Sequence, residues 1–245
     1  GRGITFPHLQ TVYYCRSSKM PQADTFWQHS RIFGYDREKE LVRIYIPRTL
    51  HSLFVSLNEA NEILIKQIEN GIENIQVIYP NGIKPTRKNV LDNQYLNMIV
   101  GGANMFANNP ISQYTKDIDS IVEQYINTEY SDVSAEILIK ILKLTGSSVH
   151  SDFDSNKYIA CIKALQEKRP TIKYRLIVRT NRDISKGTGT LLSPTDRRLG
   201  DSFKNDITLT IYRVNGSTDK GWDGSPLWIP NIKFPDGICF YNIDE

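Results

Sequence analysis

The sequence predicts two parts of different architecture: an α/β part over residues 1–85 and an α+β domain over residues 113–245, joined by a connector over residues 86–112. In the first part, a strand, a helix and a second strand follow one another with short connections, which is typical of parallel strands in an α/β sheet. The connector region is rich in proline, glycine and asparagine. In the last part, helical apolar spacing precedes strand-like alternation, which predicts helices followed by antiparallel strands.

The elements of the first part follow from residue type and spacing. Residues 11–15 and 41–46 are rich in β-branched, aliphatic and aromatic side chains, which favours two short strands. Asp24 is suited to cap a helix between these strands. The longest run of helical apolar spacing covers residues 50–70, and Gly71 is suited to end that helix.

The elements of the last part follow from a change of period. Apolar side chains recur at helical spacing in residues 118–126, 137–142 and 155–168. After Pro170 they alternate with basic residues, which predicts a strand over residues 172–179 with one apolar and one mostly basic face. Further strands are predicted over residues 207–214 and 238–241.

Composition narrows the class of protein. The chain has 245 residues, of which 40% are hydrophobic and 23% are charged, as in a folded globular protein. No apolar run approaches the roughly 20 residues that a bilayer span needs, so we expect no contact with a membrane. Three widely spaced cysteines without a Cys-x-x-Cys pair argue against a disulfide scaffold and a structural zinc site. This pattern fits a reducing, cytoplasmic location.

One short acidic segment resembles a cluster of metal ligands. The sequence His150-Ser151-Asp152-Phe153-Asp154 places three metal-ligating side chains at alternating positions. A helix that begins after Asp154 accounts for this carboxylate as a cap, and the other side chains then belong to a polar loop. We therefore expect no metal site in this chain.

Positive charge is concentrated in residues 163–220, which hold thirteen Lys and Arg against six Asp and Glu. Such a block can bind nucleic-acid phosphates without reading the base sequence. Alternatively, it lies beside an acidic surface, either of this chain or of a partner. The three cations of the predicted strand share its basic face, and Arg197 and Arg198 are expected in a loop rich in Ser, Thr and Gly. The candidate DNA-binding residues are Lys173, Arg175, Arg179, Arg182, Lys186, Arg197 and Arg198.

The first 47 residues carry the most specific chemistry. Gln28 and Arg31 are three residues apart in the predicted helix and therefore share one side of it. Arg37 follows just beyond the glycine that ends the helix. Two guanidinium groups beside a glutamine amide suit a triphosphate, because arginine forms paired bonds to phosphate oxygens and keeps its charge.

This order of motifs resembles motifs V and VI in the second RecA-like lobe of superfamily two helicases, and in finer detail the Z-one (Z1) domain family. The most specific stretches are Pro21–Tyr35 and Val42–Pro47, and the resemblance covers about the first third of the chain. It implies a partial RecA-like lobe, incomplete at its N-terminus, followed by a further C-terminal domain. The family accompanies DEAD-type ATPase domains in restriction and phage-defence systems and often carries the label endonuclease.

The resemblance also implies roles for single residues. The loop that contains Arg2, Gly3 and Thr5 would couple ATP to DNA. Arg31 and Arg37 would be the motif VI arginines, one of them an arginine finger, and Gln28 would orient the phosphates or the arginine. The usual helicase pattern places its arginines four and seven residues after the glutamine. Here they stand three and nine residues after it, which leaves open which of the two is the finger.

Two absences in the sequence limit what this chain does alone. It contains neither a Gly-x-x-x-x-Gly-Lys-[Ser/Thr] phosphate loop nor an acidic Walker B motif on an apolar strand. We therefore expect ATP and Mg²⁺ to bind in the full-length protein and no cofactor in this chain alone. The sequence also lacks the paired acidic and Asp/Glu-x-Lys motifs of restriction-type nucleases and the His-x-Lys motif of the phospholipase D type.

The sequence thus predicts the C-terminal part of an ATP-dependent, helicase-like DNA translocase in a restriction or phage-defence system. Expected partners are double-stranded DNA and an N-terminal DEAD-type ATPase domain of the same protein, with a nuclease subunit as a further candidate. The alternative is a non-catalytic interaction module that docks a nuclease or ATPase subunit.

Overall fold

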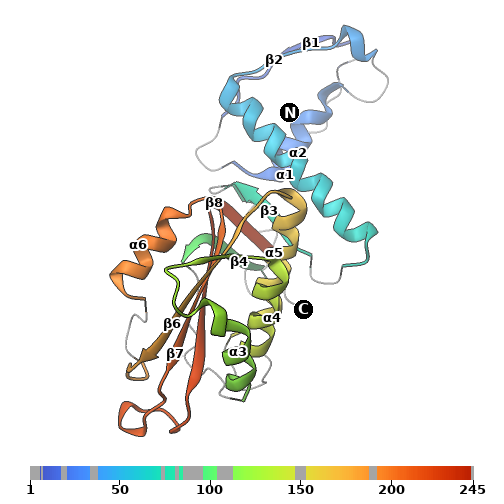
Figure 1. Ribbon diagram of the computed structural model, residues 1–245. Helices are drawn as coiled ribbons and strands as arrows, with labels where there is room; N and C mark the ends of the chain where they lie inside the picture. The colour runs from blue at the N-terminus through green and yellow to red at the C-terminus, as the bar shows by residue number, and fades with distance from the viewer. Residues whose placement is uncertain are drawn as a thin grey trace. The chain divides into compact units, whose positions relative to one another are not determined.

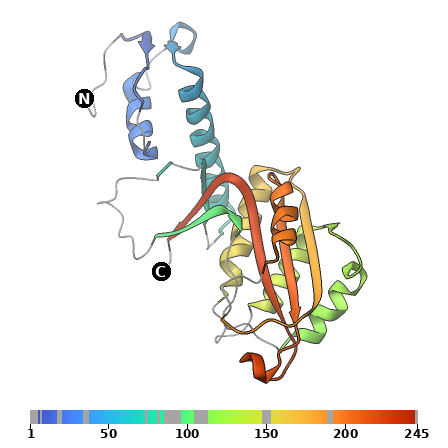
Figure 2. The ribbon, with the colours of Figure 1, turned by 90° about the vertical axis from the view of Figure 1, so that its left-hand side faces the viewer.

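The computed structural model describes residues 6, 8–17, 21–33, 38–72, 75–80, 83–84, 96–103, 113–146, 153–187 and 192–243. The chain divides into two compact units (Figures 1 and 2). The first comprises Gly1–Met98 together with Cys239–Glu245, and the second comprises Ile99–Ile238. Among the described residues, no helix combines the length and the apolar character that crossing a bilayer requires.

The first unit contains the predicted pair of parallel strands. Strand β1 (Thr11–Tyr13) pairs in parallel with β2 (Arg43–Tyr45), so that Tyr13 lies opposite Tyr45. Their rings stack with centroids 4.6 Å apart. The helical elements between the two strands are α1 (Ala23–Ser30), η1 (Arg31–Phe33) and η2 (Lys39–Leu41). The prediction of a parallel strand–helix–strand order is therefore confirmed.

The long helix α2 (Arg48–Glu69) contributes apolar side chains to the core of this unit. It ends at the predicted place, because Gly71 has a φ of 66°, a left-handed conformation that glycine adopts without steric cost. Its residues Leu50 and Leu57 form a buried cluster with α1. The side chain of Gln67 then pairs with the backbone N–H and carbonyl of Gln76, at 3.0 Å each, and holds the chain as it enters β3 (Val77–Pro80).

The second unit has the predicted order of helices followed mainly by strands. Helix α5 (Ser155–Lys168) begins as expected, since the Asp154 carboxylate accepts hydrogen bonds from two backbone N–H groups of its first turn. His150 and Asp152 lie outside the described residues. The remaining elements here are β4 (Leu96–Ala103), α3 (Thr115–Val122), η3 (Glu123–Tyr125), β5 (Ser131–Val133), α4 (Ala135–Thr145), β6 (Tyr174–Arg182), α6 (Pro194–Ser202), β7 (Ile207–Val214), η4 (Thr218–Lys220) and β8 (Leu227–Ile243). Strands β4 and β8 also include residues of the first unit.

The strand pairing corrects one prediction. The order β5-β6-β7-β8 is antiparallel at β5–β6 and β7–β8, but its central pair, β6–β7, is parallel. The prediction of antiparallel strands therefore holds for β5–β6 and β7–β8 but not for β6–β7. Helix α6 lies between β6 and β7 in the chain and returns the chain to the end of the sheet at which β6 begins. The two strands therefore run in the same direction.

The region predicted as a connector contains a strand. Strand β4 pairs with β8, which also neighbours β3 and β7 in the strand order. Composition concealed β4, because its Gly101-Gly102 pair is typical of a loop. Here glycine serves close packing, since a Cβ on Gly101 would collide with the carbonyl oxygen of Pro235 in β8. Figure 2 shows β8 as a long, curved strand.

The sheet of the second unit has one apolar and one polar face. Pairing places Leu176, Leu209 and Ile232 in one row of the apolar face, and Arg175, Thr208 and Lys233 in one row of the polar face. All six side chains are buried. Helices α3, α4 and α5 lie to one side of the strands and α6 to the other (Figure 1). The predicted basic strand face is therefore the face that α6 covers.

Helix α6 replaces the loop that was predicted around Arg197 and Arg198. Ser193 caps it by accepting a 3.1 Å hydrogen bond from the N–H of Asp196, and Pro194 occupies its first turn. A Ser-Pro-x-Asp start is a recognised helix signal, but the lack of an apolar stripe concealed it. The only buried residues of α6 are Asp196 and Gly200.

We expect Gly200→Ala to stabilise the protein. A Cβ at this helical position meets no atom within 4 Å, and alanine is favoured over glycine in a helix by about 0.5–1 kcal/mol. The free energy of unfolding from urea titration should rise by about that amount. The matched control Gly101→Ala should lower it, because its Cβ has no room. A loss of stability in Gly200→Ala would contradict this account of α6.

Candidate functional site

The predicted phosphate-binding helix of the first unit presents its polar side outward. Gln28 in α1 and Arg31 in η1 are both exposed. On the opposite side of α1, Phe26 is buried, with its ring centroid 5.0 Å from that of Phe54 in α2. The buried side fixes the rotation of α1 and leaves Gln28 and Arg31 free to reach a ligand. Arg2, Gly3, Thr5 and Arg37 lie outside the described residues.

His29 ties the end of β1 to this helix. Its Nε2 lies 3.2 Å from Nη1 of Arg16, and its Nδ1 lies 2.8 Å from the hydroxyl of Tyr14. Arginine only donates, so Nε2 accepts and Nδ1–H donates to the Tyr14 oxygen. Burial raises the pKa of Tyr14 although the charge of Arg16 opposes the shift. This contact sets the position of α1 relative to β1.

The seven candidate DNA-binding residues of the second unit fall into two sets. Arg175, Arg179 and Arg182 of β6 all bond to carboxylates of the same unit. The others, all exposed, are Lys173, Lys186, Arg197 and Arg198. The structure thus separates cations that are ion-paired within the unit from exposed cations, although all seven are close in sequence.

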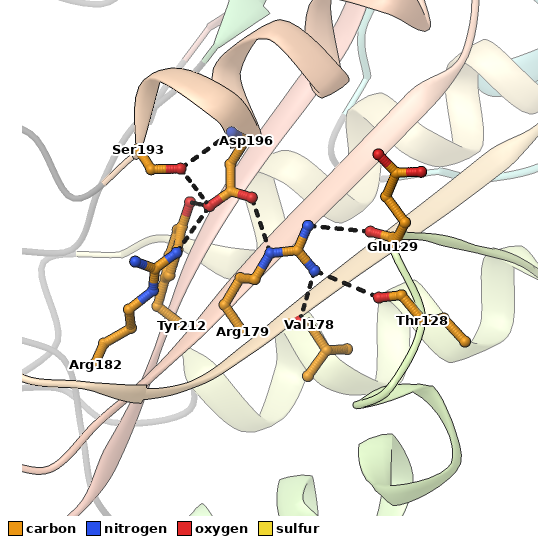
Figure 3. A network of polar contacts seen from close by, with 8 residues as sticks. All are labelled: Thr128, Glu129, Val178, Arg179, Arg182, Ser193, Asp196 and Tyr212. Carbon is orange, nitrogen blue, oxygen red and sulfur yellow. Dashed lines mark hydrogen bonds and ion pairs between the residues drawn. The ribbon is translucent and has the colours of Figure 1, made fainter.

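Asp196 is the centre of a polar network in this unit (Figure 3). Its carboxylate accepts from Nε of Arg179 at 2.8 Å, Nη2 of Arg182 at 3.0 Å, and the hydroxyls of Tyr212 and Ser193 at 2.9 Å each. Burial by itself raises the pKa of this carboxyl, but the bonds from Ser193, Tyr212 and Arg179 and the charge of Arg179 outweigh it, so the pKa is lowered. Burial and the Asp196 carboxylate raise the pKa of Tyr212.

Arg179 joins this network to the loop before β5. Its Nη2 donates to the carbonyl of Glu129 at 3.1 Å, and its Nη1 donates to the carbonyls of Val178 at 3.0 Å and Thr128 at 3.5 Å (Figure 3). Every nitrogen of the guanidinium group therefore has an acceptor within the unit. Arg179 connects β6, α6 and the loop, which is a structural role.

Arg175 is enclosed in a similar way. It forms ion pairs with Asp132 and with Asp206, the latter at 3.1 Å. Its guanidinium carbon lies 5.3 Å from the ring centroid of Tyr130 and 5.0 Å from that of Phe203. The charge pattern of the sequence could not identify these acidic partners. Asp132 precedes β6 in the sequence and Asp206 follows it, yet both lie beside Arg175 in the fold.

A bulge in β6 brings Arg182 to the same face as Arg179. Arg179 pairs with Tyr212 and Arg182 with Val214, so three steps along β6 match two steps along β7. Asn181 inside this bulge has a φ of 55°, a left-handed conformation that asparagine tolerates better than most residues. With regular alternation Arg182 would have faced the other side of the sheet.

The exposed cations have few internal partners. Among the described residues, no carboxylate lies within ion-pair distance of Lys173, Arg197 or Arg198. Lys186 lies 5.8 Å above the ring of Trp222, whose indole N–H donates to the carbonyl of Ile184. The described residues also include no group of three or more His, Cys, Asp or Glu side chains that could hold a metal ion.

We expect Asp196→Ala to lower the free energy of unfolding by about 1–3 kcal/mol, because it leaves two partly buried guanidinium groups and the buried hydroxyl of Tyr212 without their acceptor. Urea titration measures this loss. The control Arg198→Ala removes an exposed side chain of the same helix and should change stability by less than about 0.5 kcal/mol.

The same network predicts a pH dependence. The folded-state pKa of Asp196 is lowered, so its contribution is present above the unfolded value of about 3.9 and is lost as the pH falls through the folded pKa. The stability difference between wild type and Asp196→Asn should therefore shrink between pH 7 and pH 2. A difference that stays constant would contradict the charged state of Asp196.

Two protein families match this chain. The Z1 domain matches residues 1–90, which confirms the resemblance seen in the motifs, and the C-terminal domain of the restriction endonuclease CglI H-subunit matches residues 99–236. The solved C-terminal domain of the CglI restriction endonuclease H subunit is 29% identical and covers 56% of this chain and 99% of its own, with a TM-score of 0.47. No curated protein matches the chain. The chain therefore belongs to the family of the C-terminal domain of the CglI H-subunit, preceded by a Z1 domain, and is linked to a restriction endonuclease system.

Proposed function

We propose that this chain is the C-terminal part of an ATP-dependent, helicase-like DNA translocase that serves a restriction endonuclease. The Z1 part completes a RecA-like lobe and offers Gln28, Arg31 and Arg37 to ATP, while the loop with Arg2, Gly3 and Thr5 couples ATP to DNA. The observation that carries this proposal is the outward presentation of Gln28 and Arg31 on a helix whose opposite side is locked into the core.

The donors of this site fit a phosphate rather than a metal ion. A guanidinium and an amide both donate to phosphate oxygens, and the described residues provide no cluster of metal ligands. Mg²⁺ and the phosphate loop would therefore come from the DEAD-type ATPase domain of the same protein. In phosphoryl transfer, one arginine of this chain would stabilise the negative charge that develops on the transferred phosphoryl group.

Substitution of the two motif VI arginines tests the ATP role. In the full-length protein, whichever of Arg31→Ala and Arg37→Ala removes the arginine finger should lower DNA-stimulated ATP hydrolysis by about 10³–10⁵-fold. The control Arg43→Ala removes an exposed arginine of β2 and should leave the rate within a few-fold of wild type. Unchanged ATPase activity in both Arg31→Ala and Arg37→Ala would overturn the proposal.

The exposed cations of the second unit would hold the DNA backbone. Arg197 and Arg198 are neighbours on α6, and Lys173 and Lys186 lie just before and after β6. Four exposed cations can neutralise phosphates without base contacts, as a translocating motor requires, since it moves along any sequence.

A salt series measures this contact directly. We expect the 245-residue chain to bind labelled duplex DNA, with log K falling linearly with log salt. The double variant Arg197→Ser/Arg198→Ser should reduce the slope by about 2. The matched control Lys140→Ser/Lys143→Ser alters two exposed lysines of α4, on the other side of the sheet, and should leave the slope unchanged. Absence of binding even at low salt would refute the DNA contact.

One observation favours the alternative of a protein-docking module. The ion pairs of Arg175, Arg179 and Arg182 neutralise much of the charge of the basic block inside the unit. The remaining surface of α6 mixes Arg197 and Arg198 with exposed Asp201, a composition that also suits a protein partner. Under this alternative, the chain does not bind DNA, and the Arg197→Ser/Arg198→Ser variant loses binding to the nuclease subunit.

A further inference from the structure

Arg182 differs from the other two arginines of β6 in the donors that it leaves unused. The side chain of Arg175 is 10% exposed, that of Arg179 is 21% exposed and that of Arg182 is 32% exposed. All three nitrogens of the Arg179 guanidinium have acceptors. Within the described part of the chain, only Nη2 of Arg182 has one, the Asp196 carboxylate. Nε and Nη1 therefore stay available to a ligand.

Two features fix where this side chain lies. The bulge at Asn181 turns Arg182 to the α6 side of the sheet. There its guanidinium carbon lies 5.2 Å from the ring centroid of Tyr212, while Nη2 bonds to Asp196 at 3.0 Å. An arginine held over an aromatic ring and bonded through one nitrogen loses little side-chain entropy when its other nitrogens bind. Arg197, which follows Asp196 in α6, is exposed. Arg182 and Arg197 therefore both belong to the region around the first turn of α6.

A bulge with a left-handed residue other than glycine costs conformational energy. The left-handed conformation is unfavourable for L-residues other than glycine, although asparagine adopts it more often than most, and such strain persists where the surrounding structure requires it. Redirecting one side chain is a known consequence of a bulge. Here the redirected residue is an arginine whose Nε and Nη1 have no acceptor among the described residues.

We infer that Arg182 is a pre-organised contact for one DNA phosphate, and that Asn181 and Asp196 are positioning residues for it. Asn181 directs the side chain to the α6 face, and Asp196 together with Tyr212 holds it there. This inference rests on the DNA contact of the proposed function and extends it from the exposed cations to a partly buried arginine.

The test compares substitutions at Asn181 in DNA-binding salt series with the 245-residue chain and labelled duplex DNA. Arg182→Ser should reduce the salt slope by about 1. Asn181→Val removes no charge but disfavours the left-handed backbone, and should reduce the slope by the same amount. Asn181→Gly keeps that backbone conformation and should bind like wild type. In the Arg182→Ser background, Asn181→Val should have no further effect on binding, because both changes remove one contact.

The outcomes separate this inference from the proposed function. If Arg197→Ser/Arg198→Ser weakens binding while Arg182→Ser and Asn181→Val leave the slope unchanged, the inference is overturned and the DNA contact stands. If Asn181→Val lowers thermal stability without changing the slope, its role is structural and the inference is also overturned. If wild type does not bind DNA at low salt, both fail.

A second pair of variants covers the case in which Asn181→Val does not fold. Arg182→Lys keeps the charge but cannot bond to Asp196 and a phosphate through two edges of one planar group. We expect it to bind more weakly than wild type, with a circular dichroism spectrum that confirms folding. Binding equal to wild type by Arg182→Lys and Arg182→Ser alike would overturn the inference.

Discussion

Donors from β6, β7 and the residue that caps α6 converge on the carboxylate of Asp196, and the second unit depends on this convergence. Helix α6 buries no apolar side chain of its own, so it cannot dock through the hydrophobic effect alone. The carboxylate links it to Arg179 and Arg182 of β6 and to Tyr212 of β7. Since α6 is also the crossover that makes β6 and β7 parallel, the same interaction supports the topology of the central strand pair.

Because of this arrangement, a basic block in the sequence does not form an equally basic surface in the fold. The charges of residues 163–220 appear as one positive surface when they are counted along the chain. In the fold, these cations pair with carboxylates from inside and outside the block, as Arg179 does with Asp196 and Arg213 with Asp119 of α3 at 2.9 Å. Where such a pair includes a buried carboxylate, as at Asp196, it adds little net stability over apolar packing, but removal of one partner is costly. Such ion pairs restrict which cations can meet a ligand.

The two units present charge in related ways. In the first, Gln28 and Arg31 reach outward because Phe26, on the other side of the same helix, is packed against α2. In the second, Arg197 and Arg198 reach outward because Asp196, on the other side of α6, is bound to the sheet. A short helix anchored on one side thus displays cations on the other, by apolar contacts in one unit and by ion pairs in the next.

The sequence determined the elements whose signals are local. Apolar spacing located α2 and α5, Gly71 located the end of α2, and Asp154 located the start of α5, because caps and amphipathic stripes depend on residues within one or two turns. The Z1 resemblance likewise lies in a contiguous stretch of motifs. Only the tertiary structure decided that β6 and β7 are parallel, that α6 covers the basic face, and that Asn181 turns Arg182 toward Asp196. Each of these depends on which other segment of the chain supplies a partner for a charged side chain or a backbone hydrogen bond. The spacing of residues within one element does not predict that partner.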